Sequence, residues 1–513
     1  MLKSRFRITC ISLLLISLVV ILSYFIETKE LNVDSHIDYD AFKSQLNKTV
    51  PVLMSKYNIP GTAIALIRND NVDFIKGYGW ADKQNQVKVT QDTQFQVASN
   101  SKTFTSWGIM KLVEKGKLDL NTPVEKYLTR WKLPITNYNN SGVTIRRLLS
   151  HTSGLQPISY FGYAPEKKLP SLEESLSGHV KGIKELRLVL EPGTKYKYSG
   201  GEYSLLQLII EEVTGEPFSK YMEEEVLKPL GMENSSFKLK PEIQAKVSRA
   251  YGALAQSLPN YIYTEEAAAG LYTTVADFAR FTRANISIIN EKDNNSSPVS
   301  KKSLSQMLTP VKSDYGFAYI IKILPDGTRL VYHGGSNRGW RSQFAFLPEK
   351  GDGIVVLTNS ESGENLHRDL MSLLTKWETG YYPGFYYKNL ALRIMIKTMA
   401  FIFFLIILIW IGYSIRSIKN RSMILIFKCK PLSYKTIGIV VIKCLLSVTL
   451  VLVWCTAFYT GLIYNGWTFV SFMPSGFNWL TGVVILFGIF LLIRSWFMKS
   501  KTIQTGFKLN NHL

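Results

Sequence analysis

The chain has 513 residues, of which 46% are hydrophobic, and its 60 basic and 39 acidic side chains leave a formal net charge of +21. This length and apolar content suffice for a large folded domain, which excludes a disordered chain. All 39 acidic residues lie between Glu27 and Glu378, so the basic excess belongs to the two ends of the chain. No nucleic-acid partner is therefore expected, since that would require a basic face on the folded domain itself.

The chain begins with a basic and then an apolar segment. Three basic residues within the first seven precede the apolar run 8–26, which is the pattern of a signal peptide or a membrane anchor. The end of the run, from Ser23 to Glu27, offers no pair of small residues at a cleavage spacing. An uncleaved anchor is therefore favoured over a signal peptide.

A helix and a hairpin are expected next. Apolar residues at helical spacing in 38–57 predict an amphipathic helix. The segments 62–68 and 72–80 alternate or run apolar on either side of 69–71, which reads Asn-Asp-Asn. This pattern predicts two strands joined by a tight turn.

The stretch 95–116 contains the first candidate catalytic residues. Ser99 and Lys102 precede apolar residues spaced as a buried helix, which ends at a glycine. One helical turn separates the two side chains, so the lysine amine could take the serine proton if burial kept it partly neutral. The alternative is a helix cap beside a solvated lysine. The same spacing recurs at Ser235 and Lys238, where no apolar helix follows.

The remainder of the domain alternates helical and extended patterns. Helices are expected over 144–150, 202–214, 217–227 and 365–377, and strands over 329–333, 340–348 and 353–358. Strands at both ends with helices between them imply an α/β fold, in which one sheet is assembled from both ends of the domain beside a helical insert.

Two further motifs lie in this region. Tyr198 is held on a glycine-flanked loop, where a phenol near a lysine could be a phenolate or relay a proton; an ordinary turn tyrosine is the alternative. His333 is followed by Gly334 and Gly335 at the expected end of a strand. Consecutive glycines there allow a substrate to lie along the strand edge, and a backbone N–H can point at an oxyanion.

Taken in order, the Ser99-x-x-Lys102 pair, Tyr198-Ser-Gly and His333-Gly-Gly resemble the three motifs of the penicillin-recognising serine hydrolases. The resemblance is to the branch that holds class C beta-lactamases, D-stereospecific peptidases and beta-lactamase-like esterases, and it covers roughly residues 40–378. It implies an antiparallel sheet with a helical subdomain.

The resemblance also implies roles for single residues. Ser99 would be the acylated nucleophile, Lys102 its base and Tyr198 the proton shuttle, while the N–H groups of Ser99 and Ser336 would form the oxyanion hole. His333 and Gly335, at the expected end of the strand, would help to bind the substrate. The resemblance implies neither a metal nor a cofactor.

Two positions depart from the family pattern. The third position of the tyrosine motif, often Asn, is Gly200, so a side chain that would hold the substrate amide is missing. His333 replaces the lysine that many beta-lactamases use, which makes a carboxylate site for penicillins less expected. His151 resembles a structural position and is assigned no chemistry. Asn337 is expected either to hydrogen-bond a D-Asn carboxamide or to cap a turn.

Three apolar runs close the chain, each about long enough to cross a bilayer, at 398–415, 437–459 and 477–493. The segments 416–443 and 494–513 are basic and hold no acid, which predicts that they lie inside and that 27 to about 390 lies outside. Lys388, Arg393 and Lys397 oppose this topology. The expected organisation is an anchor or signal over 1–26, an extracytoplasmic hydrolase domain over 27–378, a linker over 379–397 and three membrane helices within 398–513.

This plan resembles the membrane-bound prodrug-activating peptidases of nonribosomal-peptide pathways of the colibactin, zwittermicin, xenocoumacin and amicoumacin type, which remove an N-acyl-D-asparagine leader during export. The resemblance implies a small acylated peptide as substrate, with membrane lipid and an exporter as further partners. Two alternatives stay open. One is a cell-wall D-alanyl carboxypeptidase, esterase or beta-lactamase. The other is a membrane sensor whose hydrolase-like domain has no turnover.

Overall fold

A computed structural model describes residues 17–292, 297–425, 434–464 and 477–499. It contains two compact units, Leu31–Gly384 and the described parts of 1–30 and 385–513. Outside the described residues lie the start of the predicted N-terminal apolar run, part of the basic segment 416–443, most of the basic tail 494–513, and the residues 293–296 and 465–476.

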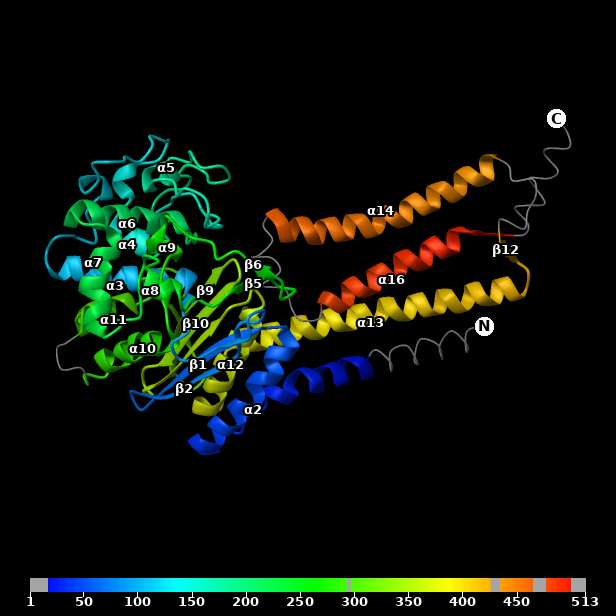
Figure 1. The fold of residues 1–513 in the computed structure, drawn as a ribbon, viewed down its shortest axis with the longest axis horizontal. Helices are drawn as coiled ribbons and strands as arrows, with labels where there is room; N and C mark the ends of the chain where they lie inside the picture. Colours follow the sequence, from blue (N-terminus) through cyan, green and yellow to red (C-terminus); the bar gives the residue numbers. More distant parts are fainter. Residues whose placement is uncertain (1–16, 293–296, 426–433, 465–476, 500–513) are drawn as a thin grey trace. The chain divides into compact units, whose positions relative to one another are not determined.

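The sheet of the larger unit joins the two ends of that unit (Figure 1). Its strands lie in the order β3-β2-β1-β11-β10-β9-β8, and each described pair is antiparallel. β1 (Gly61–Arg68), from the start of the unit, pairs with β11 (Asp352–Thr358), from its end. This pairing confirms the predicted sheet. The other strands are β2 (Asn71–Asp82), β3 (Val87–Lys88), β8 (Ile320–Ile323), β9 (Arg329–Asn337) and β10 (Trp340–Leu347).

Helices cover both faces of the sheet. α10 (Val275–Ile289) packs on β1 and β11, while α12 (Gly363–Thr379) packs on β10 and β11 and also against α2 (Tyr39–Tyr57). Phe278 of α10 lies 5.4 Å from Phe344 of β10, centroid to centroid. Because both faces are covered, β1 is buried almost throughout, and its sequence is a continuous apolar run.

The larger unit contains further strands and α-helices besides α3. They are β4 (Phe95–Gln96), β5 (Ala250–Tyr251), β6 (Ser257–Leu258), β7 (Tyr272–Thr273), α4 (Ile145–Leu149), α5 (Leu172–Leu176), α6 (Gly200–Thr214), α7 (Phe218–Met222), α8 (Pro241–Gln244), α9 (Glu266–Ala269) and α11 (Lys301–Met307). The helix predicted over 217–227 is α7 continued by a π-helical turn, Glu223–Leu227.

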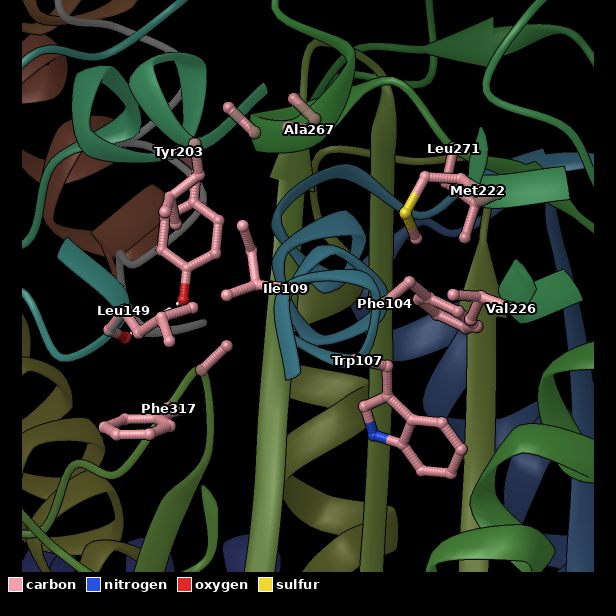
Figure 2. Close-up of a cluster of buried hydrophobic side chains, with 14 of the residues drawn as sticks. Phe104, Trp107, Ile109, Leu149, Tyr203, Met222, Val226, Ala267, Leu271 and Phe317 are labelled. Carbon is pink, nitrogen blue, oxygen red and sulfur yellow. Dashed lines mark hydrogen bonds between the residues drawn. The ribbon is translucent and has the colours of Figure 1, made fainter. Parts of the chain in front are cut away.

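Helix α3 (Ser101–Glu114) lies in the middle of the larger unit. Every residue from Ser101 to Met110 is buried, and Figure 2 shows Phe104, Trp107 and Ile109 leaving the helix on different sides. The Phe104 ring stacks 4.0 Å from Phe281 of α10. The spacing predicts a single buried stripe, whereas the helix is enclosed on all sides because α6 and α9 pack on it as well.

Strand β9 is longer than predicted. It runs to Asn337 instead of ending at His333, so the two glycines lie within the strand. A Cβ on Gly335 would lie 2.1 Å from the carbonyl oxygen of Val97. Glycine is therefore what allows β9 to pass against the turn that precedes α3.

The smaller unit contains the apolar helices. Two segments are long and apolar enough to cross a bilayer, α13 (Gly384–Lys419) and the Ile437–Trp454 part of α14 (Tyr434–Tyr464). The helix Ser17–Thr28 and the apolar part of α16 (Phe477–Ser495) are shorter. The described residues thus support two of the three predicted C-terminal crossings. β12 (Met423–Leu425) and β13 (Phe497–Lys499), which are far apart in the sequence, pair as a short two-stranded antiparallel sheet in the same unit.

Two cations that oppose the predicted topology have a partner within the smaller unit. Glu27 is fully buried, and Lys397 of α13 forms an ion pair with it. Arg393 NH1 lies 3.7 Å from the other carboxylate oxygen. One acid of the N-terminal helix therefore compensates part of the positive charge on this flank of α13.

Candidate active site

Ser99 lies in a 3-10 turn, Ala98–Asn100, immediately before α3. It is partly exposed, whereas its neighbours 93–98 and 100 are buried. Ala98 has a φ of 51°, an unfavourable conformation for alanine. Two hydrogen bonds hold the turn: Ser342 Oγ donates to the Val97 carbonyl over 2.6 Å, and Asn100 Nδ2 donates to Ser342 Oγ over 2.8 Å. The fold thus presents one serine hydroxyl on a braced turn.

Lys102 lies one helical turn further and is only 2% exposed. Its Nζ is 3.2 Å from Ser99 Oγ and donates a hydrogen bond of 2.7 Å to the Ala268 carbonyl at the end of α9. Burial lowers the pKa of Lys102 to about 7, although the charge of Glu202 opposes the shift. A substantial fraction of the amine is therefore neutral at pH 7, with a lone pair available to the serine proton.

Tyr198 reaches the same place from the loop before α6. Its ring centroid is 5.2 Å from Lys102 Nζ, and its hydroxyl is hydrogen-bonded to Ser99. Although 39% of the residue is exposed, burial raises the pKa of the phenol, and the bond to Ser99 offsets only part of that rise. Tyr198 is therefore a neutral phenol at pH 7, and the phenolate alternative is not supported.

The edge of β9 lies beside the turn that carries Ser99. β8 pairs with β9 only from Arg329 to Tyr332, so among the described strands the stretch His333–Asn337 is paired by β10 alone. An extended peptide could add to such an edge. Ser336, whose N–H was expected in the oxyanion hole, lies in this stretch.

His333 and Asn337, the two polar side chains of β9 that were predicted to bind substrate, are largely engaged in hydrogen bonds within the protein. His333 Nδ1 lies 3.3 Å from Asn100 Oδ1, and its Nε2 lies 3.2 Å from Tyr315 Oη. Burial, together with the charge of Lys102, lowers the pKa of His333 to about 3, so His333 carries no positive charge for a carboxylate. Asn337 donates from Nδ2 to Gln96 Oε1 and to the Ala269 carbonyl, over 2.8 and 3.1 Å. Its amide N–H groups are thus engaged inside the protein.

Two residues to which the sequence assigned no chemistry also belong to the site. Glu202, in the first turn of α6, and His151 are both fully buried and form a hydrogen-bonded pair. His151 has a φ of 54°, and its ring lies 4.3 Å from that of Tyr198. A glutamate in a first helical turn ordinarily needs no more explanation than the helix dipole, so the sequence carried no signal of this pairing.

The described residues bring no three His, Cys, Asp or Glu side chains together as a metal site. What they do bring together is a reachable hydroxyl, a buried amine and a neutral phenol. These are the groups that acyl transfer through a serine ester requires.

The sequence matches the family profile described as Beta-lactamase over residues 46–374. It is 30% identical over 334 residues to Protein flp of Staphylococcus aureus (strain COL), an alignment that spans 62% of this chain and only 64% of that protein. It is 29% identical to the putative penicillin-binding protein PbpX of Bacillus subtilis, over 54% of this chain and 65% of PbpX.

Solved structures share the fold. The octameric penicillin-binding protein homologue from Pyrococcus abyssi is 30% identical, with a TM-score of 0.56 over 66% of this chain and 77% of that one. The beta-lactamase/D-alanine carboxypeptidase from Pseudomonas syringae is 21% identical, with a TM-score of 0.55 over 67% of this chain and all of that one.

Proposed function

Because the chain belongs to the beta-lactamase family of serine hydrolases, we propose that it is a membrane-bound, extracytoplasmic peptidase that hydrolyses an amide after a D-residue. The observation that carries the proposal is the buried amine of Lys102, which lies 3.2 Å from the Ser99 hydroxyl and whose pKa is lowered to about 7. A lysine that only capped a helix would be solvated and charged.

The proposed reaction has two halves. In the first, Ser99 Oγ bonds to the substrate carbonyl carbon while its proton passes to Lys102 Nζ. The C–N bond then breaks, and the proton returns through the Tyr198 hydroxyl to the departing amine. In the second half, water attacks the ester, its proton passes to Lys102, and Ser99 Oγ is reprotonated as the acid leaves. The N–H groups of Ser99 and Ser336 would hold the oxyanion in both halves.

The substrate proposed first is an N-acyl-D-Asn amide, the leader of a nonribosomal-peptide prodrug. The side-chain oxygen Oδ1 of Asn337 would accept from the D-Asn carboxamide, because the side-chain nitrogen Nδ2 already donates to Gln96 and Ala269. The apolar helices of the smaller unit would hold the chain in the membrane into which an acyl tail partitions. Membrane lipid, and an exporter that delivers the precursor, are the partners that such a role requires.

A cell-wall D-alanyl carboxypeptidase is the second candidate. It is favoured by the identity of about 30% to penicillin-binding protein homologues. A carboxypeptidase must hold the terminal carboxylate of its substrate, and a neutral, buried His333 supplies no positive charge for it. For this reason the leader peptidase is the function that we propose first.

An assay of the full-length protein in detergent distinguishes the two candidate enzymes from each other and from the sensor alternative. It would be given an N-acyl-D-Asn anilide, the L-Asn epimer, a D-Ala-D-Ala peptide and a fluorescent penicillin, with Ser99→Ala as control. We expect cleavage of the D-Asn compound alone, and none by Ser99→Ala. Cleavage of D-Ala-D-Ala together with penicillin labelling would favour the cell-wall enzyme. No turnover and no acyl adduct on Ser99 by mass spectrometry would refute an enzyme.

A further inference from the structure

Glu202 is a buried carboxylate for which the proposed reaction has no use. It is 1% exposed, and its two oxygens have different partners. Ser153 Oγ donates to Oε1, and His151 Nδ1 is hydrogen-bonded to Oε2. The Ser153 backbone N–H also donates to the carboxylate. Burial raises the pKa of this carboxyl well above its ordinary value, whereas the hydrogen bonds from Ser153 and the charge of Lys102 act in the opposite direction.

The rings of Tyr198 and Tyr203 lie close to both Lys102 and the His151–Glu202 pair. The His151 ring is 4.3 Å from the Tyr198 ring and 5.4 Å from the Tyr203 ring. Lys102 Nζ lies 5.2 and 5.5 Å from the same two rings. Glu202 is thus close enough for its charge to raise the pKa of Lys102, although burial has the larger effect on that pKa.

We propose that Glu202, held in place by His151 and Ser153, is a positioning residue that sets how readily Lys102 holds a proton, and through it the pH range over which Ser99 is activated. This inference rests on the proposed role of Lys102 as the base. A carboxylate in direct contact would hold the lysine as a permanent ammonium. A carboxylate one layer away favours the ammonium only moderately, so the amine can release its proton near neutral pH.

The other titratable groups around Lys102 are neutral near pH 7. Burial raises the pKa of the surrounding phenols and lowers that of the two imidazoles; these groups are Tyr196, Tyr198, Tyr203, Tyr315, His151 and His333. The acids nearest to α9, on the other side of the lysine, face elsewhere. Glu265 is hydrogen-bonded to Tyr163 and Ser175, and the charges that act on Glu266 are those of Glu211 and Lys238. Among the described residues, the charge that acts on Lys102 is that of Glu202.

Glu202 lies in the first turn of α6, two residues after Gly200. The polar group offered by this turn is thus directed to His151, behind the site.

The test uses a fluorophosphonate, which phosphonylates a reactive serine: the Ser99 Oγ–P bond forms, fluoride leaves and the serine proton passes to the base. Labelling rates of the full-length protein would be measured from pH 5 to 9 for wild type, Glu202→Gln and Glu202→Asp. Glu265→Gln is the matched control, because it neutralises a buried carboxylate that does not face Lys102. We expect the acidic midpoint of the Glu202→Gln profile to fall by about one pH unit, and the other two profiles to keep the wild-type midpoint.

An unchanged midpoint in Glu202→Gln, or an equal fall in Glu265→Gln, would overturn the inference. If Glu202→Gln does not fold, Ser153→Ala removes one donor without removing either charge. It should move the midpoint in the same direction by less, because a carboxylate with fewer donors is more often protonated; no movement would again overturn the inference. A wild-type protein that is not labelled at any pH contradicts the proposed function itself, and the inference falls with it.

Discussion

The chain contains two Ser-x-x-Lys segments, and only one of them has the surroundings of a catalytic pair. Lys102 is 2% exposed and its Nζ lies 3.2 Å from Ser99 Oγ. Lys238 is exposed, and the hydroxyl of Ser235 is occupied by Asp277 Oδ2 at 2.9 Å and by Thr273 Oγ1. The same residues at the same spacing therefore give a base beside a reachable hydroxyl in one place and a structural hydrogen bond in the other.

The two segments differ in the structure on their C-terminal side. Ser101–Met110 forms a helix buried on every side, so the lysine in its first turn loses its water. The second segment lies in a loop before α8, where nothing encloses the lysine among the described residues. The Ser-x-x-Lys spacing therefore brings the two side chains close together, whereas burial of the lysine lowers its pKa and allows it to act as a base.

The largest effect should come from Lys102→Arg. Arginine keeps the positive charge but does not deprotonate in proteins, so it cannot accept the serine proton. We expect fluorophosphonate labelling and amide cleavage to fall about a thousandfold, with Lys238→Arg unchanged in both assays. Labelling of Lys102→Arg at the wild-type rate would remove the distinction between the two segments.

Lys102→Met should lose activity and gain stability. An unfolded lysine keeps its proton to about pH 10.4, whereas burial lowers the folded pKa of Lys102 to about 7. The folded state thus binds the proton more weakly, at a cost that is full below about pH 7 and disappears as pH rises toward the unfolded value. We expect a gain of roughly 2–4 kcal/mol at pH 6 that shrinks by pH 9, measured by denaturant unfolding. Lys238→Met should stay within about 0.5 kcal/mol of wild type.

The pH dependence of the wild-type enzyme should show an acidic limb. The base acts in its neutral form, so activity rises as pH increases through the pKa of Lys102, about 7. Below that pH, kcat/KM should fall about tenfold per unit. A profile that is flat from pH 5 to 9 would mean that Lys102 is not the group whose deprotonation limits the reaction.

The smallest effect should come from the second segment. Ser235→Ala leaves Asp277 and Thr273 without one hydrogen-bond partner, which should cost about 1 kcal/mol of stability. Its activity should equal that of wild type. Ser99→Ala should show the reverse, with unchanged stability because the hydroxyl is partly exposed. Thermal melting measures the stability of the two variants, and fluorophosphonate labelling measures their activity.

Much of the fold could be predicted from local patterns. The helix predicted over 38–57 is α2, begun by the Asp38 cap, and Asn69 and Asp70 adopt the positive φ that their turn requires. β8 and α10 were not anticipated as elements. β8 is only four residues long, so it offers too little periodicity to recognise.

The order of the motifs and the proximity of Ser99 to Lys102 could be predicted from the sequence, because both depend on spacing along the chain. The sheet built from both ends of the domain could be predicted from the order of its strands and helices. The tertiary structure alone decided which lysine is dehydrated, that Tyr198 is a neutral phenol, that His333 and Asn337 are largely occupied, and that Glu202 lies behind the base. The physical reason is that a pKa and a free hydrogen-bond group depend on neighbours contributed by distant segments. The Ala268 carbonyl, which fixes the amine of Lys102 from 166 residues away, is one such neighbour.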